Sequence, residues 1–187
     1  MRKINVFMMV TLDGFFAGSN GEIDWHVTDD EFNDYAIEQL NAVDLLLFGR
    51  KTYELMVSYW PTPIAIDDDP IVAAKMNSLP KIVFSKTLEK VDWHNTRLVK
   101  DNISTEIQRL KQQPGSDLTI MGSSDLSAYF INQGLLDEFR LMVNPVVLGR
   151  GKALFNGIKE ELKLKLMKSR TFSSGNVLNY YRLADKE

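Results

Sequence analysis

Residues Asp44–Glu54 read Asp-Leu-Leu-Leu-Phe-Gly-Arg-Lys-Thr-Tyr-Glu, and the rest of the chain can be interpreted outward from them. The apolar run Leu45–Phe48 is short and bounded, which indicates a buried strand or a fragment of a core helix. Gly49 allows a sharp turn or a close approach of the backbone to a ligand. A following helix would offer free N–H groups and a positive dipole end to a phosphate, and Arg50 and Lys51 would add charge-assisted hydrogen bonds. The stretch therefore predicts either a site for a phosphorylated ligand or an ordinary strand-to-helix turn with solvated bases.

Composition narrows the class of protein. With 187 residues, of which 44% are hydrophobic, the chain can form one sizeable core, and we expect a single domain over residues 1–187. The formal net charge of -3 gives no general attraction for nucleic acid, although a local basic pocket is compatible with it. The chain has no cysteine, and His26 and His94 lack the spacing of a zinc site. We therefore expect no metal site and assign neither histidine a role.

The apolar runs also bear on location. Each is far shorter than a membrane span, so no membrane partner is expected. The first residues lack a small-residue cleavage site, and we interpret Ile4–Leu12 as a strand and not as a signal peptide. These features predict a cytoplasmic protein.

Short apolar runs that alternate with helical patterns predict an α/β sheet. Strands are predicted at Ile4–Leu12, Leu45–Phe48, Lys81–Ser85, Thr96–Val99, Leu118–Met121 and Glu138–Val143. Helices are predicted from a capping box of Thr28 and Glu31, from Arg50 until Pro61 and Pro63 stop it, from Pro70 behind Asp69, and over 104–113 and 125–133. Residues 64–69 read as an acidic connection, and 162–166 and 177–183 as an antiparallel hairpin. The predicted fold is a three-layer α/β/α arrangement with a mostly parallel central sheet and antiparallel C-terminal strands.

A second strand–glycine–helix corner repeats the order of the first. Leu118–Met121 is followed by Gly122, Ser123 and Ser124, where a serine hydroxyl would cap the next helix. Two such corners at one sheet edge could hold both ends of a dinucleotide. Neither corner is a GxGxxG or GxxxxGK[ST] motif, and generic topology alone would also produce such corners. Both interpretations remain open from the residues alone.

Four motifs together resemble a known family. They are Met9–Gly14, Gly49–Glu54, Ile120–Ser123 and Pro145–Gly151, and they follow one another over almost the whole chain. This combination resembles the dihydrofolate reductase-like superfamily, and within it the reductase domain of bacterial riboflavin biosynthesis more than the folate enzymes. The resemblance implies a reductase that uses NADPH.

The resemblance also implies cofactor contacts. They would involve Val10, Ala17, Gly49, Arg50, Lys51, Thr52, Ser85, Lys86, Gly122, Ser123 and Ser124. Arg50 and Lys51 would meet the adenosine 2′-phosphate and Thr52 the pyrophosphate. Ser85 and Lys86 would touch the adenosine end, unless they are only an exposed strand end. The Gly122 corner would lie over the phosphates, and Val10 and Ala17 would flank the nicotinamide.

Two carboxylates are candidates for catalysis. Asp30 follows Trp25 in the way that a pterin-binding carboxylate of the folate reductases follows a tryptophan. Acids in the first turn of a helix also favour the dipole, and this ordinary explanation is the stronger one. Asp13 matches an Asp-Gly pair after the first strand of the family, where it is equally a turn former.

The substrate of the expected reductase is less defined. The riboflavin-pathway reductase usually carries a fused deaminase domain with zinc ligands, which this cysteine-free sequence lacks. The candidates are a stand-alone 5-amino-6-(5-phosphoribosylamino)uracil reductase, a dihydrofolate- or pterin-reductase-like enzyme, and a non-catalytic dinucleotide-binding protein. The resemblance implies a small-molecule substrate and a homodimer.

Overall fold

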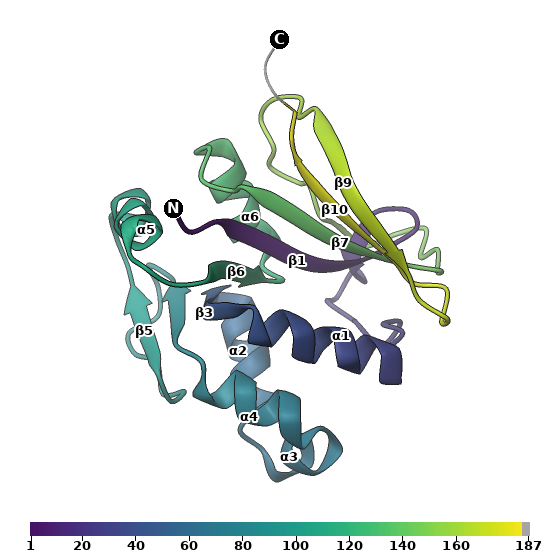
Figure 1. The fold of residues 1–187 in the computed structure, drawn as a ribbon, viewed down its shortest axis with the longest axis horizontal. Coiled ribbons are helices and arrows are strands. Elements are labelled where there is room, and N and C mark those ends of the chain that lie inside the picture. The colour runs from purple at the N-terminus through teal and green to yellow at the C-terminus, as the bar shows by residue number, and fades with distance from the viewer. Residues whose placement is uncertain (185–187) are drawn as a thin grey trace.

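Eight strands form one sheet in the computed structural model, which describes residues 1–184 (Figure 1). Their spatial order is β5 (Thr96–Val99), β4 (Lys81–Phe84), β3 (Val43–Gly49), β6 (Asp117–Met121), β1 (Ile4–Thr11), β7 (Glu138–Asn144), β10 (Val177–Leu183) and β9 (Leu164–Thr171). The strands from β5 to β7 pair in parallel, and β10 and β9 are antiparallel. The predicted mostly parallel sheet with antiparallel C-terminal strands is thus confirmed.

Helices cover both faces of this sheet (Figure 1). Side chains of α1 (Asp30–Asn41), α2 (Arg50–Tyr59) and α4 (Pro70–Ser78) pack on one face, and those of α5 (Ile103–Gln112) and α6 (Ser124–Asn132) pack on the other. A short α3 (Pro63–Asp68) contacts α4. No helix within residues 1–184 is long and apolar enough to cross a membrane.

The central strand β1 is buried on both faces, as its continuous apolar sequence predicts. Ile4, Val6, Met8 and Val10 face the core under α5 and α6. Phe7 and Met9 face the opposite side, where they pack with Tyr35 of α1. Because side chains of a strand alternate between faces, this register decides which β1 residues can reach a site on the α1 side.

Several local predictions are wrong. Residues 64–68 belong to α3 and are not a connection, and Asp69 caps the start of α4. Thr62 accepts a hydrogen bond from the amide of Ala65, and Pro63 occupies the first turn, where its missing N–H is harmless. The N-cap of α1 is Asp29 and not Thr28, because the Asp29 carboxylate accepts from the amide of Phe32 at 2.8 Å. Glu31, the other half of the predicted capping box, accepts instead from Ser173.

Three features of the strands were also missed or misplaced. β2 (Phe15–Ala17) and β8 (Lys152–Ala153) form a separate two-stranded sheet that was not predicted. β9 begins at Leu164, runs to Thr171 and is longer than predicted. Its Leu166 and Met167 are half exposed on successive positions, so both faces of this edge strand meet solvent.

Lys81 is a buried cation that closes the C-terminal end of α4. Its side chain is 1% exposed, and Nζ donates to the carbonyl oxygens of Met76, Asn77 and Leu79 at 2.8, 3.1 and 2.6 Å. Nζ also lies 4.5 Å from the centroid of the Trp93 ring. Burial lowers the pKa of Lys81 to about 8, while the three carbonyl dipoles favour the protonated form.

Lys81→Met is expected to destabilise the fold by about 2–4 kcal/mol, because it leaves one buried and two part-buried carbonyl groups without their donor. Urea unfolding of the variant and of wild type measures the difference. The control, Lys90→Met, removes an exposed lysine and should change stability by less than about 0.5 kcal/mol. Equal stabilities of the two variants would contradict the structural role of Lys81.

Candidate functional site

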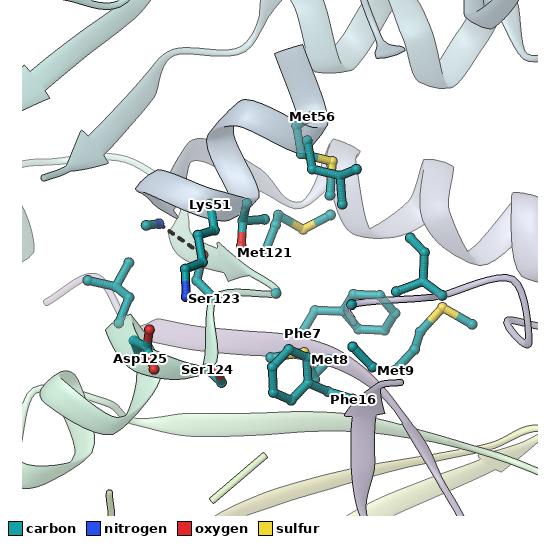
Figure 2. Close-up of a pocket in the computed structure, with 18 of the residues that line it drawn as sticks. Phe7, Met8, Met9, Phe16, Lys51, Met56, Met121, Ser123, Ser124 and Asp125 are labelled. Carbon is teal, nitrogen blue, oxygen red and sulfur yellow. Dashed lines mark hydrogen bonds between the residues drawn. The ribbon is translucent and has the colours of Figure 1, made fainter. Parts of the chain in front are cut away.

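The carboxyl ends of β3, β4, β5 and β6 open onto a cleft of about 1650 Å³ (Figure 2). The residues at or just after these strand ends line it: Gly49–Thr52, Ser85 and Lys86, Lys100, and Gly122–Asp125. The small β2/β8 sheet contributes Phe16, Ala17, Lys152 and Ala153 from another side. Ligands of open α/β sheets bind at this edge because helix N-termini face the same crevice.

One hydrogen bond joins the two glycine corners. The amide of Gly49 donates to Ser123 Oγ at 2.9 Å, shown as the dashed line in Figure 2. Ser123 therefore stands at the N-cap position of α6 without capping it through its side chain, in contrast to the prediction. The starts of α2 and α6 are held side by side at the cleft.

The second corner has a backbone that crowds out side chains. Gly122 has a φ of +61°, and a Cβ added there would lie 3.3 Å from Thr52 Cγ2. The backbone of Ser123 also lies in the left-handed region, with a φ of 59°. The corner therefore brings main chain, and not side chain, next to the first turn of α2.

Basic side chains dominate the polar lining. Five cations line the cleft, namely Arg50, Lys51, Lys86, Lys100 and Lys152, and Asp125 is the single acid among the described lining residues. In Figure 2 the Lys51 side chain extends from α2 toward the corner that carries Ser124 and Asp125. Arg50 Nη1 lies 3.3 Å from Glu54 Oε1 in an exposed ion pair. Such a pair is weak enough for a ligand anion to take the place of the Glu54 carboxylate. The cleft is thus basic in a chain whose net charge is -3.

Most of the predicted cofactor residues come together here. Ala17, Gly49, Arg50, Lys51, Thr52, Ser85, Lys86, Gly122, Ser123 and Ser124 all line the cleft. Val10 does not, because its side chain belongs to the core on the opposite face, and the neighbouring Met9 reaches the cleft instead. The Ser85 hydroxyl oxygen accepts from the amides of Thr87 and Leu88 and also lies 3.3 Å from the Thr87 hydroxyl oxygen, so Ser85 is tied into its own turn. The cofactor-binding roles of the predicted residues stay predictions.

The two candidate catalytic carboxylates lie elsewhere. Asp30 is exposed in the first turn of α1 and does not line the cleft. Asp13 accepts from Thr11 Oγ1 at 2.6 Å and from the amides of Gly149 and Leu148 at 2.7 and 3.3 Å, and the hydrogen bond from Thr11 leads the effects that lower its pKa. These bonds tie the turn after β1 to the loop before β8. Geometry thus gives neither carboxylate a position in the cleft, and both catalytic assignments stay predictions.

Sequence reasoning missed several lining residues, among them Lys100 and His26. Lys100 directly follows β5, and Lys86 stands two residues after the end of β4. A basic residue just after a predicted strand was therefore the sequence pattern that could have indicated Lys100. His26 lines the cleft with a buried Nε2 that has no hydrogen-bond partner within residues 1–184. Burial lowers the pKa of His26 to about 4, so the imidazole is neutral near pH 7.

The neighbouring Val27 fixes the position of His26. The Val27 amide donates to Asn144 Oδ1 at 2.9 Å, and its carbonyl accepts from Asn176 Nδ2 at 2.9 Å. Both asparagines are fully buried. They lie 117 and 149 positions away in sequence, so no local pattern could have indicated this clamp.

Solved structures with the same fold define the class. A putative riboflavin biosynthesis protein from Shewanella sp. PV-4 aligns with a TM-score of 0.74 and 24% identity, over 98% of this chain and 99% of that one. The Thermotoga maritima diaminohydroxyphosphoribosylaminopyrimidine deaminase/5-amino-6-(5-phosphoribosylamino)uracil reductase aligns with a TM-score of 0.69 and 17% identity, over 98% of this chain and 57% of that one. Dihydrofolate reductase from Enterococcus faecalis, complexed with NADP(H), gives 0.64 and 14%, over 98% and 97%. The fold is therefore dihydrofolate reductase-like.

Sequence comparison defines the family more narrowly. The model of the RibD C-terminal domain matches residues 2–178, and the chain belongs to that family. The protein YyaP of Bacillus subtilis (strain 168) is 42% identical over 182 residues, which cover 96% of this chain and 94% of YyaP. The resemblance that the motifs indicated is thereby confirmed.

His26→Gln is expected to flatten the acid side of the stability profile. The folded-state pKa of about 4 lies below the ordinary 6.5, so the unfolded chain binds more protons between these values. Wild type should therefore lose stability as pH falls from 6.5 toward 4, and the variant should lose less. Urea unfolding at several pH values in this window measures the slope. The control His94→Gln, which removes an exposed imidazole, should keep the wild-type slope; equal slopes for His26→Gln and wild type would refute the prediction.

Proposed function

We propose that this chain is an NADPH-dependent reductase of a small planar heterocycle, with 5-amino-6-(5-phosphoribosylamino)uracil as the first substrate to test. The observation that carries the proposal is a single cleft with two linked helix starts and five cations around an apolar floor. Membership of the RibD C-terminal domain family supports the reductase class. Fold relatives that include a uracil reductase and an NADP(H)-bound enzyme agree with it.

The residues present fit a phosphorylated dinucleotide. The N-termini of α2 and α6 open side by side, so both offer free N–H groups and positive dipole ends to a pyrophosphate. Gly122 allows close approach of a ligand beside Thr52. Arg50, Lys86 and Lys100 lie at three neighbouring strand ends and would receive the additional 2′-phosphate.

The other part of the cleft suits a hydride acceptor. Hydride transfer is the chemistry that NADPH supplies when bound, and the protein contributes orientation and exclusion of water. Phe7, Met8, Met9, Phe16 and Met121 give this part an apolar surface (Figure 2). The neutral His26, whose buried Nε2 has no hydrogen-bond partner within residues 1–184, would offer a hydrogen bond to the substrate.

Arg50→Ala is expected to weaken NADPH binding about tenfold and to leave NADH binding nearly unchanged, because a charge-assisted contact to the 2′-phosphate is worth roughly 1.5 kcal/mol. Fluorescence titration with both nucleotides measures the affinities. The control Arg182→Ala removes an exposed arginine of β10 and should alter neither affinity. Wild-type affinities that are equal for NADPH and NADH would contradict the proposed cofactor.

Gly122→Ala should weaken NADPH and NADH alike, because a Cβ would narrow the corner next to Thr52 where the shared pyrophosphate is expected. Gly134→Ala is a matched control. It has a similar φ of +65° but nothing within 4 Å of the added Cβ, so it experiences the same backbone strain of about 1–2 kcal/mol away from the cleft. Thermal unfolding and nucleotide titration of both variants separate strain from binding. Intact nucleotide binding by Gly122→Ala would place the pyrophosphate elsewhere.

A further inference from the structure

Five of the residues that line the cleft are Phe7, Met9, Tyr35, Gln39 and Met121, and we call the part of the cleft that they line the chamber. Phe7 and Met121 are paired residues of β1 and β6, and they form the floor together with Met9. Tyr35 and Gln39 come from successive turns of α1 and form the wall. Figure 2 shows Phe7 and Met9 on one side of the cleft, away from Lys51 and Asp125, with Met121 between Lys51 and Phe7.

Gln39 is a buried amide in this largely apolar surface. It is 5% exposed, and its Oε1 accepts from Tyr35 Oη at 2.5 Å. Burial raises the pKa of Tyr35 well above its ordinary range, so the hydroxyl keeps the proton that it donates. On the other side, Gln39 Nε2 lies 3.4 Å from Met121 Sδ.

These two contacts fix the orientation of the amide. A thioether sulfur can only accept, and only weakly, so the nitrogen must face Met121 and the oxygen must face Tyr35. The amide nitrogen carries two protons, and within residues 1–184 the weak sulfur acceptor is its only partner. Buried amide donors are normally bonded to oxygen or nitrogen, and an unmet one is unfavourable by about 1–3 kcal/mol.

We propose that Gln39 determines substrate specificity, and that its spare amide N–H donates to a carbonyl oxygen or unprotonated nitrogen on the edge of the bound ring. This inference rests on the proposed function, because it assumes that the substrate ring lies next to a cofactor bound at the two glycine corners. Met121 directly precedes Gly122, so the chamber and the glycine corner adjoin in the chain as well as in space. Met121 is also a flexible side chain, which a ring can displace with little loss.

The test uses lumazine, a fluorescent bicyclic ring with two carbonyl groups, titrated into the full-length protein with and without NADP⁺. Wild type should bind lumazine saturably. Gln39→Met keeps the side-chain length and removes the donor, and it should weaken binding at least tenfold without changing NADPH affinity. Gln39→Glu retains the acceptor for Tyr35, lacks the amide donor, and carries the test if the first variant does not fold.

Gln108→Met is the matched control, because Gln108 is exposed on α5 and does not line the cleft. It should bind lumazine and NADPH as wild type does. The proposal is overturned if wild type does not bind lumazine, if a folded Gln39 variant binds it as tightly as wild type, or if lumazine and NADPH affinities fall together. Failure of the proposed function has a separate signature, namely wild type that binds lumazine but no NADPH.

Discussion

The hydrogen bond from the Gly49 amide to the Ser123 hydroxyl organises the cleft, because it connects two strand ends that are 74 residues apart. Ser123 could have capped its own helix, and its hydroxyl bonds the start of α2 instead. A single bond of this kind contributes only about 1 kcal/mol of net stability. Its importance is geometric: it sets two helix N-termini against one crevice and places Thr52 against the glycine backbone of the other corner.

The basic character of the cleft depends on the same parallel topology. Arg50, Lys86 and Lys100 are far from one another in sequence, but each stands at or just after the end of a strand, and parallel neighbours end at one edge. Because each cation is attached to a different strand, the positive charge is spread along the crevice. Such an array suits an extended polyanion better than a single phosphate ion, and it requires no overall positive charge on the chain.

The sequence predicts what local patterns encode. Apolar runs, the Asp69–Pro70 helix start and the two glycine corners gave most of the sheet, the helices and the phosphate-facing side of the cleft. β2 and β8 were not predicted, because a pair of very short strands is defined by pairing between residues that are distant in sequence. Val10 was assigned to the cleft by the family resemblance, and the sequence could not correct this because a continuous apolar run does not reveal which face of a strand a ligand meets. The position of His26 in the cleft was not predicted, because it depends on bonds from Val27 to Asn144 and Asn176, which are distant in sequence.

These differences separate the two halves of the site. The corners at Gly49 and Gly122 consist of main chain and short motifs, which would suit any phosphorylated dinucleotide and can be read from sequence. Gln39 Nε2 and His26 Nε2 are buried polar atoms whose hydrogen-bonding capacity is partly or wholly unused within residues 1–184. An apolar side chain at either position would pack without that desolvation penalty. This supports the proposal that a ligand completes their hydrogen bonds. Under that proposal, the choice of substrate would lie in α1 and in the segment around Val27, outside the motifs of the two glycine corners.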